Sequence, residues 1–297
     1  NINDEQIKPY LELEHVKKGV FGLATKLYGL QFIPNPEIQT YHKEVQALDV
    51  LDEDGKYLAV LYVDFFPREG KSGGAWMTEF KPQWIEKDGT DSRPHISIVM
   101  NFSRPTDSAP SLLTFDELTT FLHEFGHSIH GMVAKSKYAE LSGTNVYRDF
   151  VELPSQLMEN WALEKEYLDS FAEHYQTGEK IPAELIDKIK KSANFNTGYF
   201  TLRQLSFGFL DMAWHTITSE YTGDAEEFET KAWESTQLLP KVKGTLMSSN
   251  FTHIFSGGYS AGYYGYKWAE VLDADAFAFF KQNGIFDKAT ATSFLNN

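Results

Sequence analysis

The segment FLHEFGHSIH, residues 121–130, places three histidines and one glutamate among apolar residues. His123 and His127 are four residues apart, so on an α-helix they project side by side and two imidazole nitrogens can bind one metal ion. Glu124 is offset around the same helix, where its carboxylate can take a proton from a water that the metal activates. This H-E-x-x-H pattern predicts metal-assisted hydrolysis, but it also occurs by chance, so the rest of the chain must support it.

His130 is the third histidine of the segment and follows His127 by three residues. A third imidazole from the same helix is poorly aimed at an ion that an i, i+4 pair already holds. We therefore expect His130 to pack against backbone or neighbouring side chains.

An open metal site needs a third protein ligand. The chain contains no Cys, so this ligand must come from His, Asp or Glu. Asp149 can cap a helix whose first turn contains Glu152, and that helix could deliver Glu152 to the metal. Spacing alone leaves Glu140 as an alternative, whereas Glu159 and Glu164 are typical of solvated charges on a helix face.

Asp149 has two possible roles. Its carboxylate could accept the free N–H of a metal-bound imidazole, because such imidazoles usually donate to an acidic partner. A plain helix cap is the equally weighted alternative.

Tyrosines alternate with glycines in FSGGYSAGYYGY, residues 255–266. Such a segment could simply pack aromatic rings, and for Tyr264 we favour this interpretation. Metal-assisted hydrolysis also needs a hydrogen-bond donor for the oxyanion of its intermediate, and a phenol or imidazole on a glycine-flanked loop is suited to that role.

The helix that must carry His123 and His127 is well signalled. Thr114 precedes Phe115, Asp116 and Glu117, which is a capping box with an acidic first turn. Apolar residues then recur at helical spacing at Leu118, Phe121, Leu122, Phe125, Ile129 and Met132.

The remaining elements predict a predominantly helical α+β fold. A helix over residues 9–28 is followed by short alternating segments that indicate a small antiparallel sheet, among them HISIVMNFS. From residue 113 onward helical patterns dominate, including AELIDKIKKSA after Pro182 and residues 197–218. No repeat or flexible linker is evident, so we expect a single domain over residues 1–297.

Composition narrows the classes of partner. Lys and Arg number 27 against 42 Asp and Glu, which gives a formal net charge of −15 and argues against nucleic acid or an anionic membrane. No apolar run approaches the about 20 residues of a membrane-spanning helix, and no signal-peptide pattern begins the chain. We expect a monomer in the cytoplasm.

Two segments together carry a resemblance to a known family. HEFGHSIHG followed by SGTNVYRDFVELPSQLMENWA is similar to the thimet oligopeptidase family of zinc metallopeptidases. The resemblance implies that His123, His127 and Glu152 bind one zinc ion and that Glu124 is the general base. The motif glutamate of the family follows the second histidine by 25 residues, as Glu152 follows His127.

The same resemblance extends to HIFSGGYSAGYYGYKW, which is similar to the H-x-x-G-G-Y-x-A-x-Y-Y-G-Y block of the family. It implies that His253, Tyr259 and Tyr266 stabilise the transition state. Substrate binding is expected at Tyr263, Gly257 and Gly258.

The spacing within this block favours one branch of the family. His253 precedes Tyr259 by six residues, one more than in the thimet oligopeptidase pattern, and this longer loop resembles that of the bacterial peptidyl-dipeptidase, or dipeptidyl carboxypeptidase, branch. The resemblance implies a zincin-like catalytic domain that acts on short peptides. It covers nearly the whole chain but only the catalytic part of a family member, without its N-terminal helical half and a short C-terminal tail.

Three hypotheses of function follow. The first is the release of C-terminal dipeptides from short peptides. HISIVMNFS could offer a strand edge to the extended substrate, and a plain core strand is the alternative of similar weight. The second is an endo-acting oligopeptidase of the same family. The third, from another class, is a zinc- and peptide-binding module that is catalytically silent.

Overall fold

The computed structural model describes residues 3–296, whose contacts divide them into two compact units. Unit 1 contains the residues up to Val146, Leu153–Ser192, and those from Leu272 onward. Unit 2 contains Tyr147–Glu152 and Ala193–Val271.

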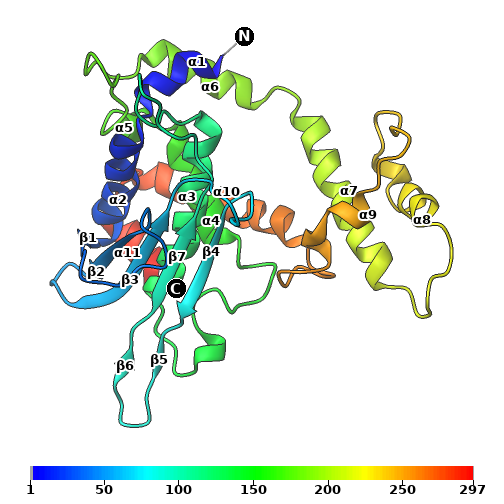
Figure 1. The fold of residues 1–297 in the computed structure, drawn as a ribbon, viewed down its shortest axis with the longest axis horizontal. Coiled ribbons are helices and arrows are strands. Elements are labelled where there is room, and N and C mark those ends of the chain that lie inside the picture. Colours follow the sequence, from blue (N-terminus) through cyan, green and yellow to red (C-terminus); the bar gives the residue numbers. More distant parts are fainter. Residues whose placement is uncertain (1–2, 297) are drawn as a thin grey trace. The chain divides into compact units, whose positions relative to one another are not determined.

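A five-stranded sheet lies at the centre of unit 1 (Figure 1). In spatial order its strands are β1 (Gln31–Pro34), β2 (Gln46–Leu51), β3 (Tyr57–Asp64), β7 (His95–Val99) and β4 (Trp76–Lys81). A separate short hairpin pairs β5 (Trp84–Ile85) with β6 (Asp91–Ser92).

The sheet is mixed, whereas the sequence pattern predicts an antiparallel one. β3 and β7 run parallel, with Val60 opposite His95 and Asp64 opposite Val99. The chain leaves β3 for the outer strand β4 and returns through the β5–β6 hairpin, so β7 enters between them antiparallel to β4 and parallel to β3. The predicted α+β class is confirmed, and within the five-stranded sheet the parallel pairing of β3 with β7 departs from the predicted antiparallel pattern.

β7 contains the first residues of HISIVMNFS, the segment expected to offer its edge to a substrate. That prediction was wrong, because β7 is hydrogen-bonded to β3 on one side and to β4 on the other. Within residues 3–296, the outer strand on this side of the sheet is β4.

Helices pack around this sheet and share one apolar core with it. The helices assigned wholly or mainly to unit 1 are α1 (Asp4–Ile7), η1 (Lys8–Tyr10), α2 (Leu13–Tyr28), α3 (Phe115–Met132), η2 (Ala139–Leu141), α4 (Leu153–Glu159), η3 (Asn160–Leu163), α5 (Lys165–Leu168), α6 (Ala183–Ala193), α10 (Gly265–Asn283) and α11 (Lys288–Asn296). The first residues of α10 belong to unit 2. Among the described residues, no helix combines the length and apolar character needed to cross a membrane.

α3 begins where the capping box predicts. Thr114 Oγ1 accepts from the backbone N–H of Glu117 at 3.0 Å, and Thr114 N–H donates to Glu117 Oε2 at 2.8 Å. The apolar stripe is buried as expected, at Leu118, Phe121, Leu122, Phe125, Ile129 and Met132. Glu124, His127 and Ser128, which lie off this stripe, are buried as well, so α3 is enclosed on more than its apolar face.

The second helix of the site starts later than predicted. α4 begins at Leu153, so Glu152 lies immediately before it rather than in its first turn. Pro154 lacks an N–H and therefore fits the first turn of a helix, where that donor would have no partner within the helix. Tyr147 O accepts the backbone N–H groups of Phe150 and Val151, so the chain up to Glu152 forms turns.

Gly126 allows α4 to start directly against α3. A Cβ at this position would lie 2.4 Å from Pro154 O and 2.6 Å from the Ser155 Cα. Any side chain would therefore push the two backbones apart. The glycine of HEFGH thus sets the separation between the histidine helix and the residue that follows Glu152.

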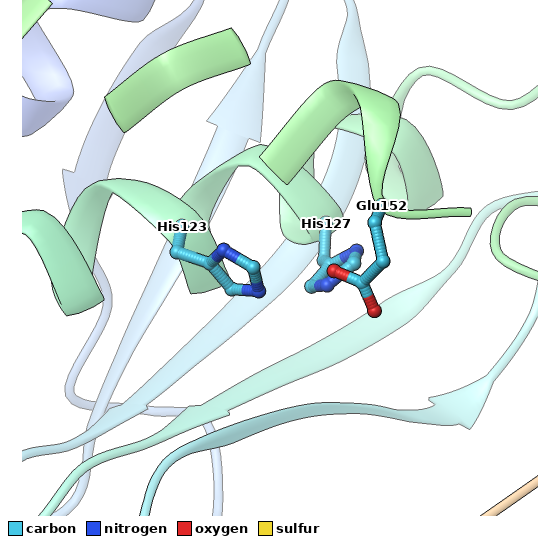
Figure 2. Close-up of side chains that lie close together, drawn as sticks. All are labelled: His123, His127 and Glu152. Atoms are coloured by element: carbon cyan, nitrogen blue, oxygen red, sulfur yellow. The ribbon is translucent and has the colours of Figure 1, made fainter. Parts of the chain in front are cut away.

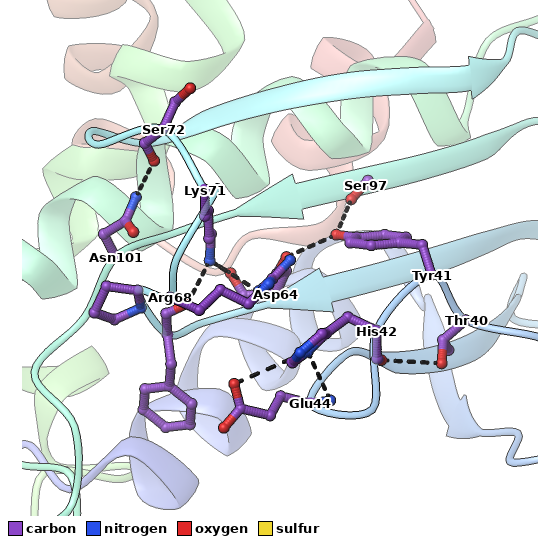
Figure 3. Close-up of polar contacts among 12 residues, drawn as sticks. Thr40, Tyr41, His42, Glu44, Asp64, Arg68, Lys71, Ser72, Ser97 and Asn101 are labelled. Carbon is purple, nitrogen blue, oxygen red and sulfur yellow. Dashed lines mark hydrogen bonds and ion pairs between the residues drawn. The ribbon is translucent and has the colours of Figure 1, made fainter.

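A buried ionic cluster fixes the chain between β3 and β4 (Figure 3). Asp64 accepts two hydrogen bonds from Arg68 at 2.7 and 2.8 Å, one from Lys71 at 2.9 Å and one from Tyr41 at 2.9 Å. Burial acts to raise the pKa of Asp64, but these hydrogen bonds outweigh it and hold the pKa below its usual value.

The loop just before β4 is also held from β7. Asn101, which follows that strand, donates from Nδ2 to the carbonyls of Ser72 and Gly74 at 2.9 and 2.7 Å. The outer strand β4 therefore starts from a fixed point.

Unit 2 is mainly helical. Its elements are α7 (Thr197–His215), α8 (Ala225–Ala232), η4 (Glu234–Thr236), α9 (Met247–Asn250) and η5 (Thr252–Ile254). Phe207, Leu210, Ile254 and Tyr263 form its buried core, with Trp214 and Phe251 packed against them.

We predict that Gly126→Ala destabilises the protein by about 1–3 kcal/mol, because overpacking at a backbone contact forces α3 and α4 apart. The free energy of unfolding can be measured by urea denaturation.

Gly22→Ala is the matched control, because Gly22 lies inside α2 and a Cβ there meets nothing within 4 Å. This variant should gain up to about 1 kcal/mol through helix propensity alone. Equal stability of Gly126→Ala and the parent protein would contradict the proposed role of the helix contact.

Candidate metal centre

α3 presents His123 and His127 side by side. Their ring centroids are 5.0 Å apart, and the rings are nearly perpendicular. His127 is buried, and the side chain of His123 is 22% exposed. The helix therefore offers two imidazoles to one point in space, as the four-residue spacing predicts.

Glu152 completes a three-residue group (Figure 2). One donor atom from each of His123, His127 and Glu152 lies within 4.8 Å of the others. Within residues 3–296 this is the cluster of three side chains suited to hold a metal ion. Two imidazoles and one carboxylate form the donor set of open, catalytic zinc sites, so these residues fit such an ion.

Burial strengthens this interpretation of Glu152. The residue is only 1% exposed, and a buried carboxylate is costly unless cations or hydrogen-bond donors compensate it. Tyr259 donates its hydroxyl to Glu152 Oε1 at 2.5 Å. A metal cation at this position would supply positive charge that favours the ionised Glu152 carboxylate.

Glu124 follows His123 on α3 and is 7% exposed. Its backbone carbonyl accepts from Ser128 Oγ at 2.9 Å, so the helix is reinforced at the turn between the two histidines. The side chain is thus carried by the same rigid turn that carries the candidate ligands.

Glu159 was missed as a functional residue. Its Oε1 lies 2.6 Å from His123 Nδ1, although the side chain is 39% exposed, as expected of a charge on a helix face. This contact leaves Nε2 of His123 for a metal, and it matches the carboxylate–histidine pairs that orient metal ligands. The sequence offered no local signal for this contact, because His123 and Glu159 lie 36 positions apart on two different helices.

Asp149 has another partner. Its Oδ2 accepts from the Tyr264 hydroxyl at 3.3 Å, within unit 2. Its role beside a metal-bound imidazole stays a prediction, while the partner observed for His123 is Glu159.

His253, Tyr259 and Tyr266 are gathered in unit 2. His253 Nε2 lies 2.7 Å from the Tyr266 hydroxyl, and the Tyr259 ring stacks on His253 at 4.8 Å and on Tyr266 at 5.2 Å. Burial raises the pKa of both phenols. Burial lowers the pKa of His253, and the negative charge of Glu152 partly offsets this effect on the histidine. Both phenols therefore stay protonated and can donate at neutral pH.

The other predicted residues of this loop have structural contacts. Tyr263 lies in the core of unit 2 and donates to Gln204 Oε1 at 3.0 Å, and burial raises its pKa to about 12. Gly257 and Gly258 have φ values of 75° and 87°, which few other residues adopt. A Cβ at Gly258 would lie 3.5 Å from the guanidinium carbon of Arg148.

His130 does not join the metal group. It lines a separate cavity of unit 1 together with Leu27 and Val133. Burial, and secondarily His127, lowers its pKa to about 4, so it is neutral at physiological pH. This placement agrees with a packing role.

We predict that Glu159→Gln lowers the affinity for a divalent metal ion by about 10–100-fold, because the amide orients His123 less strongly than the carboxylate does. Competition with a chromogenic chelator measures this affinity directly.

Glu166→Gln is the control. The side chain of Glu166 is 67% exposed and forms a 3.7 Å ion pair with Lys26, so the same change of charge is made away from the metal group. If Glu159→Gln bound metal as tightly as the control, the contact with His123 would have no part in ligand orientation.

Comparison with known proteins agrees with this geometry. The model of peptidase family M3 matches residues 1–297. The chain is 42% identical to a dipeptidyl carboxypeptidase of Salmonella typhimurium (95% of this chain, 42% of the relative) and 39% identical to oligopeptidase A of that organism (100% and 44%). It is also 36% identical to a thimet-like oligopeptidase of Dictyostelium discoideum (99% and 44%), and it spans less than half the length of each of these relatives. The resemblance inferred from the motifs is confirmed, and the chain belongs to peptidase family M3.

Proposed function

We propose that this chain forms the catalytic part of a zinc metallopeptidase that hydrolyses short peptides. The observation that carries the proposal is the convergence of His123 and His127 of α3 with Glu152. Glu124 follows His123 on the same helix α3. Relatives named as a dipeptidyl carboxypeptidase and an oligopeptidase support it.

A zinc ion held by two imidazoles and one carboxylate would supply Lewis acidity, which lowers the pKa of water and polarises a peptide carbonyl. Glu124 takes the proton of the attacking water and then passes it to the leaving amine. Glu159 holds His123 in the tautomer that keeps Nε2 free of a proton.

Tyr259, Tyr266 and His253 are the proposed stabilisers of the oxyanion. The raised pKa values of the two phenols support this role, because a protonated hydroxyl is the species that donates. The 2.7 Å contact between His253 and Tyr266 holds this pair in a fixed relative orientation. Gly257 and Gly258 form part of the loop backbone. Tyr263 anchors this loop through its hydrogen bond to Gln204, and we propose that it also contacts the substrate.

The outer strand β4 takes the role that was expected of HISIVMNFS. An extended peptide can add to an exposed strand edge through backbone hydrogen bonds. β4 is the outer strand, and the Asp64 cluster and Asn101 hold the loop that leads into it. These anchors support a rigid edge for substrate binding.

Release of C-terminal dipeptides is the mode that we favour, and an endo-acting oligopeptidase is the second candidate. Identities of 42% and 39% to relatives named for the two modes keep both in consideration. An exopeptidase of this kind needs a cation for the terminal carboxylate. Arg148 and Arg203 are two candidates for this cation. The guanidinium carbon of Arg148 lies 5.5 Å from the Tyr259 ring centroid, whereas that of Arg203 lies over Phe207, so the contacts favour Arg148.

A cytoplasmic, monomeric protein is the setting that we propose for this activity. One relative from Arabidopsis thaliana is named a probable cytosolic oligopeptidase A, and another from that plant is named organellar. Fractionation of cells that produce the protein, followed by size-exclusion chromatography with light scattering, tests both points.

We predict that Glu124→Gln abolishes peptide hydrolysis, with a loss of at least about 10²-fold in kcat, while one zinc ion stays bound, because the variant removes the base and keeps the three ligands. Turnover of a fluorogenic peptide and zinc content by atomic absorption measure the two effects.

The same experiment separates catalysis from simple binding. Stoichiometric zinc with no Glu124-dependent turnover in the unmodified protein would favour the silent zinc- and peptide-binding module.

For the mode of cleavage, we predict that a short peptide with a free C-terminus is hydrolysed at least about 10-fold faster than its C-terminal amide, because the uncharged amide cannot form an ion pair with a cation such as Arg148. Mass spectrometry of the products identifies the released dipeptide. Equal rates for the two peptides, with internal fragments, would support the endo-acting alternative.

A further inference from the structure

The segment that carries His253 and Tyr259 has little regular structure of its own. Between residues 247 and 263 it forms only the single turns α9 and η5, followed by irregular backbone. Ala261 has a φ of 56°, a left-handed conformation that is unfavourable for a residue with a side chain. Such a backbone keeps one conformation only if the surrounding structure holds it.

Asp211 holds the end of this segment. It lies on α7, is fully buried, and accepts from Ala261 N–H at 2.8 Å through Oδ1 and from Tyr263 N–H at 3.0 Å through Oδ2. His215, one helical turn further on, lies 2.9 Å from Oδ1. The strained residue Ala261 is thus bonded directly to a buried carboxylate.

Glu229 holds the beginning of the segment in the same way. It lies on α8, is fully buried, and accepts from Met247 N–H at 3.1 Å and from Ser248 N–H at 2.7 Å. Ser248 Oγ donates to the same carboxylate at 2.9 Å, and Lys241 Nζ lies 3.3 Å from it.

The two carboxylates share an arrangement that ordinary core packing does not require. Each is fully buried, and burial of a polar group is costly unless hydrogen bonds compensate it. Each bonds to two backbone N–H groups, which fixes the path of the main chain rather than one side chain. Hydrogen bonds to a charged acceptor are also about twice as strong as neutral ones.

We propose that Asp211 and Glu229 are positioning residues that clamp the two ends of residues 247–263 and thereby set the relative placement of His253 and Tyr259. The proposal rests on the proposed function of these two side chains in stabilising the oxyanion. Neither carboxylate contacts His253 or Tyr259 in the hydrogen bonds described, so both act through the backbone. A shift of about 1 Å in such donors is enough to cost about 10²-fold in rate.

The decisive test uses Asp211→Asn and Glu229→Gln, with Glu227→Gln as the matched control because Glu227 is exposed on the same helix as Glu229. Amide hydrogen exchange is followed in the zinc-loaded protein. Asp211→Asn should raise the exchange rates of the Ala261 and Tyr263 amides by at least about 10-fold, and Glu229→Gln those of Met247 and Ser248. In both variants kcat should fall by about 10–100-fold while KM changes less than about threefold, and Glu227→Gln should match the parent protein.

Unchanged exchange at these amides, or unchanged kcat, in a folded Asp211→Asn or Glu229→Gln variant overturns the proposal. If both variants fail to fold by circular dichroism, the unmodified protein still provides a test. Its Ala261 and Tyr263 amides should exchange at least about 10-fold more slowly than in an unstructured peptide, and unprotected amides would refute the clamp.

Failure of the proposed function gives a different pattern. If the protein is not a peptidase, Glu124→Gln equals the parent protein in turnover, yet the exchange effects of Asp211→Asn persist. If the clamp is wrong, Glu124→Gln is inactive and the exchange pattern is unaffected by Asp211→Asn.

Discussion

The close approach of α3 and α4 at Gly126 is the constraint on which the candidate site depends. Pro154 O would lie 2.4 Å from a Cβ at this position, so the two backbones can come together only because residue 126 is a glycine. α3 supplies two donors from successive turns, and the residue just before α4 supplies the third. The metal group is therefore a consequence of a backbone contact as much as of the three ligand side chains.

Buried carboxylates then recur at every level of the structure. Buried Glu152 belongs to the candidate metal group, and buried Asp64, at the end of β3, accepts from three side chains. Glu159, which contacts His123, is partly exposed. In unit 2, Asp211 and Glu229 bond to backbone N–H groups instead. Burying a carboxylate costs free energy that its hydrogen-bond partners must offset. These buried carboxylates therefore fix the geometry of their partners at a cost in stability.

Much of this arrangement could be predicted from the sequence because its signals are local. The capping box at Thr114, the apolar stripe of α3 and the four-residue spacing of His123 and His127 depend on helical periodicity alone. Glu152 could not be chosen over Glu140 by spacing, and only the family resemblance identified it.

The predictions that failed concern contacts between segments that lie far apart in the sequence. The parallel pairing of β7 with β3 depends on how the chain crosses the sheet, which alternation of apolar residues does not encode. The contact of Glu159 with His123 joins residues 36 positions apart, and a lone glutamate on a helix usually is solvated. Asp211 and Glu229 gave no sequence signal, because the backbone N–H groups that donate to them lie 18 to 52 residues further along the chain.

The central claim is that one zinc ion is held jointly by His123, His127 and Glu152. A crystal structure of the zinc-loaded protein, with anomalous difference density recorded on both sides of the zinc absorption edge, tests this claim most directly. The account predicts a single peak about 2.0–2.2 Å from one nitrogen of each histidine and from a carboxylate oxygen of Glu152. A peak bound to other residues, or a Glu152 carboxylate remote from the two histidines, would contradict it.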